Sequence, residues 1–375
     1  MWLKQLTLMN FKNYEEEDIA FLPGVNALTG DNGAGKTNLL DAVHYLSLCK
    51  SYFNPIDSQQ IRRESDWFMV QGIFEKEQKE EIVSCSLKRN QKKKFKRNQK
   101  EYIRLADHIG IFPLVMISPN DSVIITEGSE ERRRFIDNVI SQTDNKYLDE
   151  LIIYNKHLLN RNRFLKQHAG YETIDRELLA VLDEQIIRSG KTIYEQRKLF
   201  MEAFVPLFNE LYGYLTENAE PVLLVYDSQL HNHALEELLV NSFPRDRMLE
   251  RTTSGVHKDD LQFSVNGMPL KKFGSQGQQK SFLIALKLAQ YRYLQKKKGF
   301  KPMLLLDDIF DKLDDKRTKR LMHMVSQEDF GQIFVTHTNS GKIASVFDGI
   351  DCELSIFEVT NGKIKTSEMN DDGSE

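Results

Sequence analysis

The segment GDNGAGKT at residues 30–37 constrains the fold of this chain more than any other part of its sequence. It matches the pattern Gly-x-x-x-x-Gly-Lys-Ser/Thr in full. It follows a short β-like run at 25–29 and precedes a helical pattern at 38–50, whose apolar residues on one face are Leu39, Leu40, Val43 and Leu46. A strand that leads through a glycine-rich loop into a helix is typical of an α/β domain. The segment therefore predicts an α/β fold with a phosphate-binding loop (P-loop).

The residue types in this loop are suited to binding the phosphate groups of a nucleotide. Its glycines allow the tight turn and the positive φ angles with which successive N–H groups face one anion. Lys36 is expected to reach the β- and γ-phosphates of a nucleotide, and Thr37 to hold Mg²⁺. The predicted nucleotide-binding residues of the loop are Gly30, Asp31, Asn32, Gly33, Ala34, Gly35, Lys36 and Thr37. The plainer alternative is a glycine-rich turn with a solvated lysine.

An apolar segment that ends in two acids, MLLLDD at 303–308, is the second candidate. It is typical of a buried strand, and an α/β sheet presents its ligands beyond the carboxyl ends of its strands. We expect Asp307 to lie beside the Mg²⁺, directly or through water, and Asp308 to polarise the attacking water. An ordinary acidic turn is the alternative, and the P-loop in the same chain disfavours it.

Two further motifs have an ordinary structural explanation when each is taken alone. In GSQGQ at 274–278, Ser275 could simply cap the following helix, although such a loop at a helix N-terminus also binds anions. His337 follows a predicted strand at 333–336, where a surface histidine is the ordinary explanation. Ser275 lies 32 residues before Asp307, and His337 lies 30 residues after it.

Composition excludes several classes of protein. No apolar run approaches the ~18 residues that a membrane span needs, and the first residues lack the apolar core of a secretory signal. Three cysteines, odd in number and far apart, exclude a disulfide scaffold and indicate a reducing compartment, so we expect a cytoplasmic protein without a membrane partner. The net charge is −4, so any surface for nucleic acid must be a local patch.

The length of 375 residues favours about two domains. The sequence predicts mostly helices from Ser129, a plausible helix N-cap, to about residue 250. In one of these helices apolar residues repeat about every 3.5 residues, and the helix is expected to end at Pro206. The simplest architecture is an α/β head built from residues 1–128 and 251–365, an inserted helical arm at 129–250 and a disordered tail at 366–375.

The order of these motifs is that of an ABC-type ATPase head, and within that class the chain resembles the RecF family over nearly its whole length. The resemblance is carried by FKNY (11–14), GDNGAGKTNLLDAV (30–43), ISPND (117–121), EGSEERRRFID (127–137), GVHKDDL (255–261), FGSQGQQKS (273–281) and LLLDDIFDKLD (304–314). The chain departs from the family pattern at Val256 and Lys258, where Pro and Arg are usual, at Asn120, where Glu is usual, and at His337, where Thr is frequent.

The resemblance implies an ATP-dependent homodimer with two sandwiched nucleotides, each with Mg²⁺. Ser275, Gln276, Gly277 and Gln278 would then act in trans on the partner's nucleotide, and residues 311–314 would link the two sites. A weak, DNA-stimulated hydrolysis of ATP to ADP and phosphate would use Lys36, Asp308, Ser275 and His337 as catalytic residues, with Thr37 and Asp307 as metal ligands. The implied role is in DNA repair, replication and the SOS response, acting on gapped or single-stranded DNA and assisting RecA loading with RecO and RecR.

Two basic segments are candidates for contact with DNA. Residues 88–100 (KRNQKKKFKRNQK) carry eight Lys or Arg and no acid, with Phe95 in the middle. They form either a hairpin whose lysines protect a sheet edge or a patch that follows phosphates without reading sequence. The second candidate is Arg132, Arg133 and Arg134, whose alternative is pairing with Glu127, Glu130 and Glu131. The sequence leaves open whether this hairpin or the arm contacts DNA.

Three other functions stay open on the sequence alone. A transporter ATPase subunit usually places its motifs closer than the 239 residues that separate Lys36 from Ser275. A chromosome-organising ATPase of the SMC type would need a far longer coiled coil than this arm. A non-catalytic DNA-binding module could use ATP only as a structural ligand, and retained function in an Asp308→Asn protein would favour it.

Overall fold

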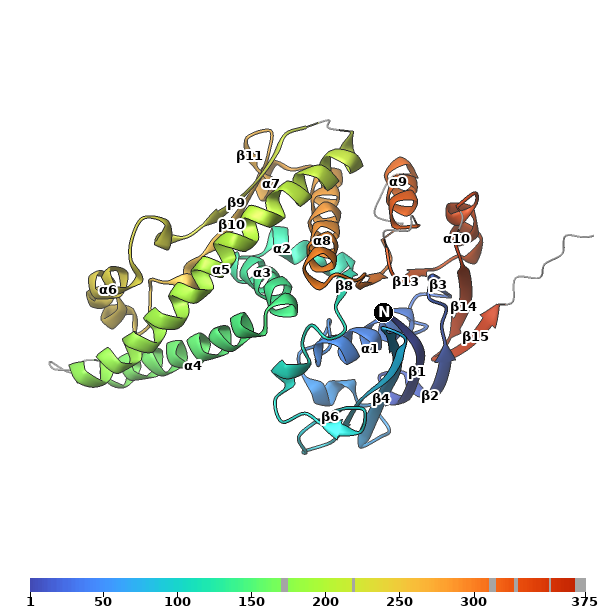
Figure 1. Ribbon diagram of the computed structural model, residues 1–375, viewed down its shortest axis with the longest axis horizontal. Coiled ribbons are helices and arrows are strands. Elements are labelled where there is room, and N and C mark those ends of the chain that lie inside the picture. The colour runs from blue at the N-terminus through green and yellow to red at the C-terminus, as the bar shows by residue number, and fades with distance from the viewer. Residues whose placement is uncertain (170–174, 218–219, 310–314, 327–329, 351, 368–375) are drawn as a thin grey trace, which may run out of the picture. The chain divides into compact units, whose positions relative to one another are not determined.

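The computed structural model describes residues 1–169, 175–217, 220–309, 315–326, 330–350 and 352–367. The chain forms two compact units, which Figure 1 shows. Unit 1 contains residues 1–121 and 284–375, and unit 2 contains residues 122–283. Unit 1 is thus built from both chain ends. Unit 2 includes residues 251–283, which the motif order predicted to lie in the head.

Unit 1 contains a six-stranded sheet in the order β15-β14-β3-β13-β12-β8. Its strands are β3 (Val25–Thr29), β8 (Leu114–Ile117), β12 (Met303–Leu306), β13 (Ile333–His337), β14 (Leu354–Thr360) and β15 (Lys363–Ser367). Neighbouring strands are parallel except for the pair β14 and β15. β3, β8, β12 and β13 are buried along their whole length, as in a sheet covered on both faces. The predicted α/β class is confirmed.

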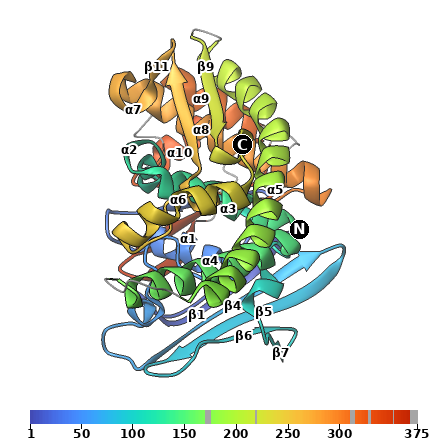
Figure 2. The same ribbon diagram turned by 90° about the vertical axis from the view of Figure 1, so that its left-hand side faces the viewer.

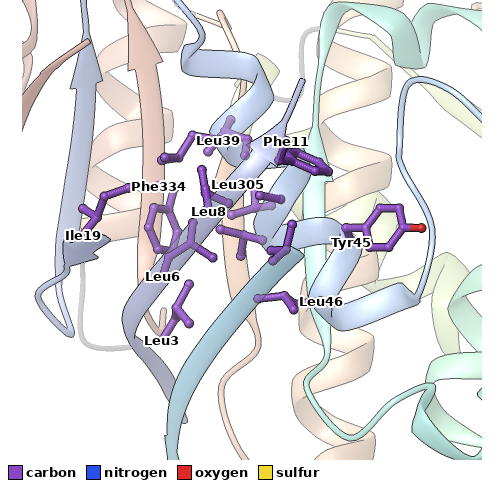
Figure 3. Close-up of a cluster of buried hydrophobic side chains, with 14 of the residues drawn as sticks. Leu3, Leu6, Leu8, Phe11, Ile19, Leu39, Tyr45, Leu46, Leu305 and Phe334 are labelled. Carbon is purple, nitrogen blue, oxygen red and sulfur yellow. The ribbon is translucent and has the colours of Figure 1, made fainter. Parts of the chain in front are cut away.

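An antiparallel sheet in the same unit has the order β2-β1-β4-β5-β6-β7 (Figure 2). Its strands are β1 (Trp2–Phe11), β2 (Tyr14–Ala20), β4 (Trp67–Lys76), β5 (Lys79–Lys88), β6 (Lys94–Arg97) and β7 (Lys100–Glu101). The helix α1 (Lys36–Leu48) contacts strands of both sheets. Leu6 and Leu8 of β1, Leu39 of α1, and Leu305 and Phe334 of the parallel sheet belong to one buried cluster (Figure 3). Packing in this cluster holds α1, the helix that begins at the P-loop, against both sheets.

The remaining elements of unit 1 are short, apart from residues 284–298 of a helix that begins in unit 2. They are η1 (Asp57–Gln60), η2 (Leu105–His108), η3 (Pro119–Ser122), α9 (Asp315–Ser326) and α10 (Ser340–Phe347). The predicted disordered tail begins too early, because residues 366 and 367 pair with β14 as part of β15, while residues 368–375 lie outside the described residues. Within the described residues no helix combines the length and the apolar character of a membrane span.

Unit 2 combines helices with a small sheet. Its helical elements are α2 (Val123–Thr126), α3 (Ser129–Thr143), α4 (Asn145–Gln167), α5 (Arg176–Thr216), η4 (Gln229–His231), α6 (Leu235–Leu249), η5 (Val256–Lys258), α7 (Leu270–Phe273) and the start of α8 (Gln276–Lys298). A three-stranded antiparallel sheet in the order β11-β10-β9 contains β9 (Val222–Asp227), β10 (Asp260–Val265) and β11 (Met268–Pro269). β9 lies within the predicted helical arm, where the sequence predicted no strand.

Two predicted helix boundaries in unit 2 are wrong. α5 does not stop at Pro206 but continues to Thr216. A proline removes one helical hydrogen bond, but the buried apolar stripe goes on past it, and packing of such a stripe supplies most of a helix's stability. α3 begins at Ser129 itself, so Gly128 and not Ser129 is its N-cap residue.

Two buried arginines connect the helices of unit 2. Arg197 on α5 lies 2.9 Å from the carboxylate of Asp137 on α3 and 2.8 Å from that of Asp259. Arg161 on α4 lies 2.6 Å from the carboxylate of Asp246 on α6. Buried charges are tolerated only when they are paired in this way. These ion pairs therefore fix how the helices of unit 2 pack against the segment that follows α6.

We predict that Arg197→Met lowers the free energy of unfolding by about 3–5 kcal/mol, because it leaves the carboxylates of Asp137 and Asp259 without their cation. Urea unfolding followed by circular dichroism measures the loss. The matched control is Arg134→Met, since Arg134 pairs with two glutamates at the surface of α3, and such surface pairs contribute at most about 1 kcal/mol. Equal losses in the two variants would contradict the proposed role of Arg197.

Candidate nucleotide site

The P-loop joins β3 to α1 in unit 1, and its three glycines adopt conformations that other residues avoid. The φ angle is 140° at Gly30, 82° at Gly33 and 124° at Gly35. A Cβ atom at Gly30 would lie 2.2 Å from the carbonyl oxygen of Val359, and one at Gly35 would lie 2.6 Å from the amide nitrogen of Asn13. The backbone angles therefore favour glycine at all three positions, and at Gly30 the nearby backbone of Val359 also leaves no space for a side chain.

The turn between β1 and β2, FKNY, contacts the P-loop through two side-chain hydrogen bonds. The side-chain amide of Asn13 donates to the carbonyl of Ala34 (3.0 Å), and the hydroxyl of Tyr14 donates to the carbonyl of Gly35 (2.9 Å). Burial raises the pKa of Tyr14, so its hydroxyl stays a neutral donor. Asn13 and Tyr14 thus support the loop. This role has no local signal in the sequence, where the two residues belong only to the family resemblance.

The ammonium group of Lys36 lies over its own loop. It donates to the carbonyls of Gly30 (2.5 Å) and Asp31 (2.8 Å). Burial lowers the pKa of Lys36, and the nearby carboxylates of Asp308 and Asp307 oppose that shift. A cation held among carbonyl oxygens at this place is well situated to bind a phosphate.

The carboxylate of Asp307 lies at the end of β12, is 4% exposed, and accepts three side-chain hydrogen bonds. The donors are the hydroxyls of Thr37 (2.8 Å), Thr336 (3.1 Å) and Ser118 (3.3 Å). Burial raises the pKa of Asp307, and these three hydroxyl groups oppose the shift. The structure thus brings together Thr37 and Asp307, the two residues predicted to be metal ligands.

A hydroxyl and a carboxylate are the oxygen ligands that Mg²⁺ prefers, and this ion usually takes its remaining ligands from phosphates and water. Among the described residues no group of three or more His, Cys, Asp or Glu could hold a metal. Thr37 and Asp307 therefore fit a metal that is bound together with a nucleotide, and do not fit a separate structural metal site.

Asp308 adopts a left-handed conformation, with a φ angle of 49°. Its N–H donates to the hydroxyl of Thr336 (2.9 Å), which in turn donates to Asp307. Asp308 is more exposed than Asp307. Asp and Asn tolerate this conformation better than most residues. The two adjacent acids therefore have different surroundings, as different roles would require.

His337 ends β13 and is 3% exposed, so it is not a surface histidine. Its Nδ1 atom accepts a hydrogen bond from the backbone N–H of Asn339 (3.0 Å). Since Nδ1 accepts, the neutral ring carries its proton on Nε2. This tautomer offers Nε2–H as a donor, which is the group that a contact with the γ-phosphate would use.

Residues Ser275–Gln278 lie in unit 2 at the start of α8, whereas the P-loop lies in unit 1. The Ser275 N–H donates to the side-chain oxygen of Gln278 (2.6 Å), and the Gln278 N–H donates to the Ser275 hydroxyl (3.2 Å). This reciprocal pair is a capping box, which orders an exposed helix N-terminus. An action of these residues in trans stays a prediction. Residues 311–314 lie outside the described residues.

The basic segment 88–100 forms the end of β5, a turn, β6 and the start of β7. Phe95 is 1% exposed and packs against His108, so it is a core residue. Lys93 pairs with Asp57 (2.8 Å), and Arg97 donates to Glu81 (2.6 Å). In the part of the chain that the structure describes, the lysines of this segment without an ion pair are Lys88, Lys92, Lys94, Lys96 and Lys100.

The second basic candidate is mostly engaged within unit 2. Arg132 pairs with Asp260 (2.6 Å), and Arg133 donates to the carbonyl of Asp259 (2.6 Å). Arg134 pairs with Glu130 and Glu131, as the structural alternative predicted. The prediction that Arg132 pairs with one of the three glutamates is wrong. β10 brings the more distant Asp260 to it, and Glu127 contacts Arg132 through its backbone carbonyl and not through its carboxylate.

Comparisons of sequence show which known proteins this chain resembles. A family model described as the RecF/RecN/SMC N terminal domain matches residues 2–365. The chain is 48% identical over 366 residues to the DNA replication and repair protein RecF of Phocaeicola vulgatus, covering 97% of this chain and 98% of that protein. It is 47% identical over 359 residues to RecF of Flavobacterium johnsoniae, covering 96% and 100%.

Comparisons of structure give the same result. The chain is similar to the recombination mediator protein RecF-ATPrS of the RecFOR pathway, with a TM-score of 0.86 and 30% identity over 97% of this chain and 98% of that one. It shares the fold of the Smc head domain of Pyrococcus furiosus, with a TM-score of 0.58 and 19% identity over 98% and 96%. The resemblance and the ABC-type head fold are confirmed, and the transporter and SMC alternatives are set aside. The chain belongs to the RecF family of DNA replication and repair proteins.

Proposed function

We propose that this protein is an ATP-dependent DNA-binding protein of recombinational repair and replication restart in the cytoplasm. Two copies close on gapped DNA when ATP is bound, and hydrolysis of ATP to ADP and phosphate reopens them. The observation that carries the proposal is the 2.8 Å hydrogen bond between Thr37 and Asp307, which joins the P-loop to the end of β12. The similar solved structures of RecF-ATP and RecF-ATPrS support ATP as the nucleotide.

Each residue of the site has a part in this reaction. The loop N–H groups and Lys36 bind the phosphates, and Thr37 and Asp307 hold Mg²⁺, which neutralises charge on the phosphates when it is bound. Asp308, the more exposed of the two acids, orients and polarises the attacking water. The Nε2–H group of His337 donates to the γ-phosphate. Hydrolysis is weak, and DNA stimulates it.

The homodimer completes this site. Ser275, Gln276, Gly277 and Gln278 of one copy contact the γ-phosphate held by the P-loop of the other. Their capping box and exposure support this role, because an ordered helix N-terminus at the surface is a ready anion site. Closure therefore requires ATP in at least one of the two P-loops.

The DNA surface and the partners follow from the same proposal. The exposed lysines of the segment 88–100 contact phosphates of single-stranded or gapped DNA without reading its sequence. The protein then assists loading of RecA with RecO and RecR, and the RecFOR pathway of the similar solved structures supports these partners.

We predict that binding to gapped duplex DNA, measured by fluorescence anisotropy with Mg²⁺, tightens when ATP is added and weakens with salt. Contact with about five phosphates would give a slope near −4.5 in a plot of log K against log salt. Lys36→Ala should lose the effect of ATP. Asp308→Asn should keep it but release DNA more slowly, because hydrolysis reopens the dimer.

Equal binding with and without ATP would contradict the nucleotide-closed dimer. A release rate for Asp308→Asn equal to that of the wild type would favour the non-catalytic module, in which ATP is only a structural ligand.

We predict that Ser275→Arg keeps its affinity for a fluorescent ATP analogue but no longer dimerises with ATP, as measured by sedimentation velocity. The reason is that Ser275 serves the partner's nucleotide. Mixing it with Lys36→Ala should restore a heterodimer, since one composite site then has an intact P-loop and an intact Ser275. Ser58→Arg is the control at another exposed serine. Loss of ATP binding by the Ser275→Arg monomer would argue against a trans role.

We predict that the triple change of Lys92, Lys94 and Lys100 to Gln lowers affinity for gapped DNA and reduces the salt slope by up to about 2.7, because each lost phosphate contact contributes about 0.9. ATP binding should not change. A control with the same loss of charge changes the exposed Lys316, Lys319 and Lys365 to Gln. If both variants lose affinity equally, the segment 88–100 is not the DNA surface.

A further inference from the structure

In unit 1 the buried side chains of Asp121 and Lys287 form a group with the partly buried Tyr52, and the function proposed above does not use this group. The ammonium of Lys287 lies 2.6 Å from Oδ1 of Asp121, and the hydroxyl of Tyr52 donates to the same oxygen. Lys287 also donates to the Tyr52 hydroxyl (3.3 Å). Lys287 and Asp121 are 6% and 4% exposed. The group joins the segment after α1, the segment after β8, and α8.

This group is connected to the carboxylate of Asp307. The second oxygen of Asp121, Oδ2, accepts a hydrogen bond from the N–H of Ser118 (2.8 Å). The hydroxyl of Ser118 donates to Asp307 (3.3 Å). Asp121 therefore fixes the residue that orients the predicted metal ligand.

The same group is connected to the helix that carries Thr37. The N–H of Tyr52 donates to Oδ1 of Asp41 on α1 (2.7 Å), and Lys12 lies 2.5 Å from Oδ2 of Asp41. Asp41 is fully buried and lies four residues after Thr37, about one helical turn away. Tyr52 thus links the elements on both sides of the proposed Mg²⁺ position.

A buried ion pair adds little net stability compared with apolar residues of the same volume, because both charges lose their hydration. Its clearer effect is geometric, since Asp121 can satisfy Ser118, Tyr52 and Lys287 only in one orientation. Burial and Asp121 raise the pKa of Tyr52, so its hydroxyl remains a donor to that carboxylate.

We propose that Tyr52, Asp121 and Lys287 are positioning residues, which act through Ser118 to hold Asp307 in the orientation that receives Mg²⁺. The proposal rests on the nucleotide site described above. Groups that orient a metal ligand commonly change metal affinity by about 10–100-fold when they are removed. The Mg²⁺ requirement of nucleotide binding should therefore respond to Tyr52, although Tyr52 itself touches neither ligand.

The test uses Tyr52→Phe, which keeps the ring and removes the hydroxyl. Mg²⁺ is titrated into the full-length protein with a fluorescent, non-hydrolysable ATP analogue. The half-saturating Mg²⁺ concentration should rise about tenfold, while affinity for the analogue in EDTA stays unchanged. Ser118→Ala should give a shift in the same direction. The double variant should exceed the larger single shift only slightly, because both changes act on one path.

The matched control is Tyr291→Phe, which removes the hydroxyl of a buried tyrosine in unit 1. That hydroxyl donates to the carbonyl of Pro302 (3.1 Å) and accepts from the N–H of Gly331 (2.8 Å). This variant should lose similar stability without a change in Mg²⁺ requirement. An equal rise in this control, or no rise in Tyr52→Phe and Ser118→Ala, would overturn the positioning role. A wild-type protein that binds the analogue without any dependence on Mg²⁺ would overturn this role and the proposed metal ligands together.

Discussion

The buried carboxylate of Asp307 is the constraint on which the arrangement of unit 1 depends. A carboxylate removed from water must be hydrogen-bonded, because an unsatisfied one costs several kcal/mol. Its partners are the hydroxyls of Thr37, Ser118 and Thr336, which come from α1, the segment after β8, and β13. Four segments that are distant in sequence must therefore meet at one edge of the sheet. An arrangement that separated these segments would leave the buried carboxylate without its hydrogen bonds.

The register of the parallel sheet explains how the segments meet. Thr29 pairs with His337, and Leu306 pairs with both Val335 and Ile117. The carboxyl ends of β3, β8, β12 and β13 therefore lie close to one level, and every residue that follows them enters the same region. Since all four strands are buried, a shift in register would move buried apolar side chains as well. Core packing thus fixes the geometry of the site.

The sequence predicted those features that depend on local backbone and motif order. The glycines of the P-loop, the two acids after an apolar strand and the strand-end His337 could all be read in this way, since each has its own local signal. Tertiary packing decides the roles that the sequence predicted wrongly or incompletely. The apolar stripe of α5 stays buried past Pro206, so the helix continues. The alternation of β6 turns Phe95 into the core, and the distant strand β10 supplies the partner of Arg132. The cluster of Tyr52, Asp121 and Lys287 joins three distant segments, so no local pattern predicts it.

The left-handed conformation of Asp308 shows how the fold assigns different chemistry to two adjacent acids. Such a conformation costs a residue with a side chain roughly 1–2 kcal/mol, so the surrounding structure must hold it. One hydroxyl does so: Thr336 accepts from the N–H of Asp308 and donates to the carboxylate of Asp307. The chain turns at this point, so Asp307 stays buried against Thr37 while Asp308 is left partly exposed. A regular strand would have continued its alternation into the covered faces of the sheet, where a second carboxylate could not contact the water that the proposed reaction requires.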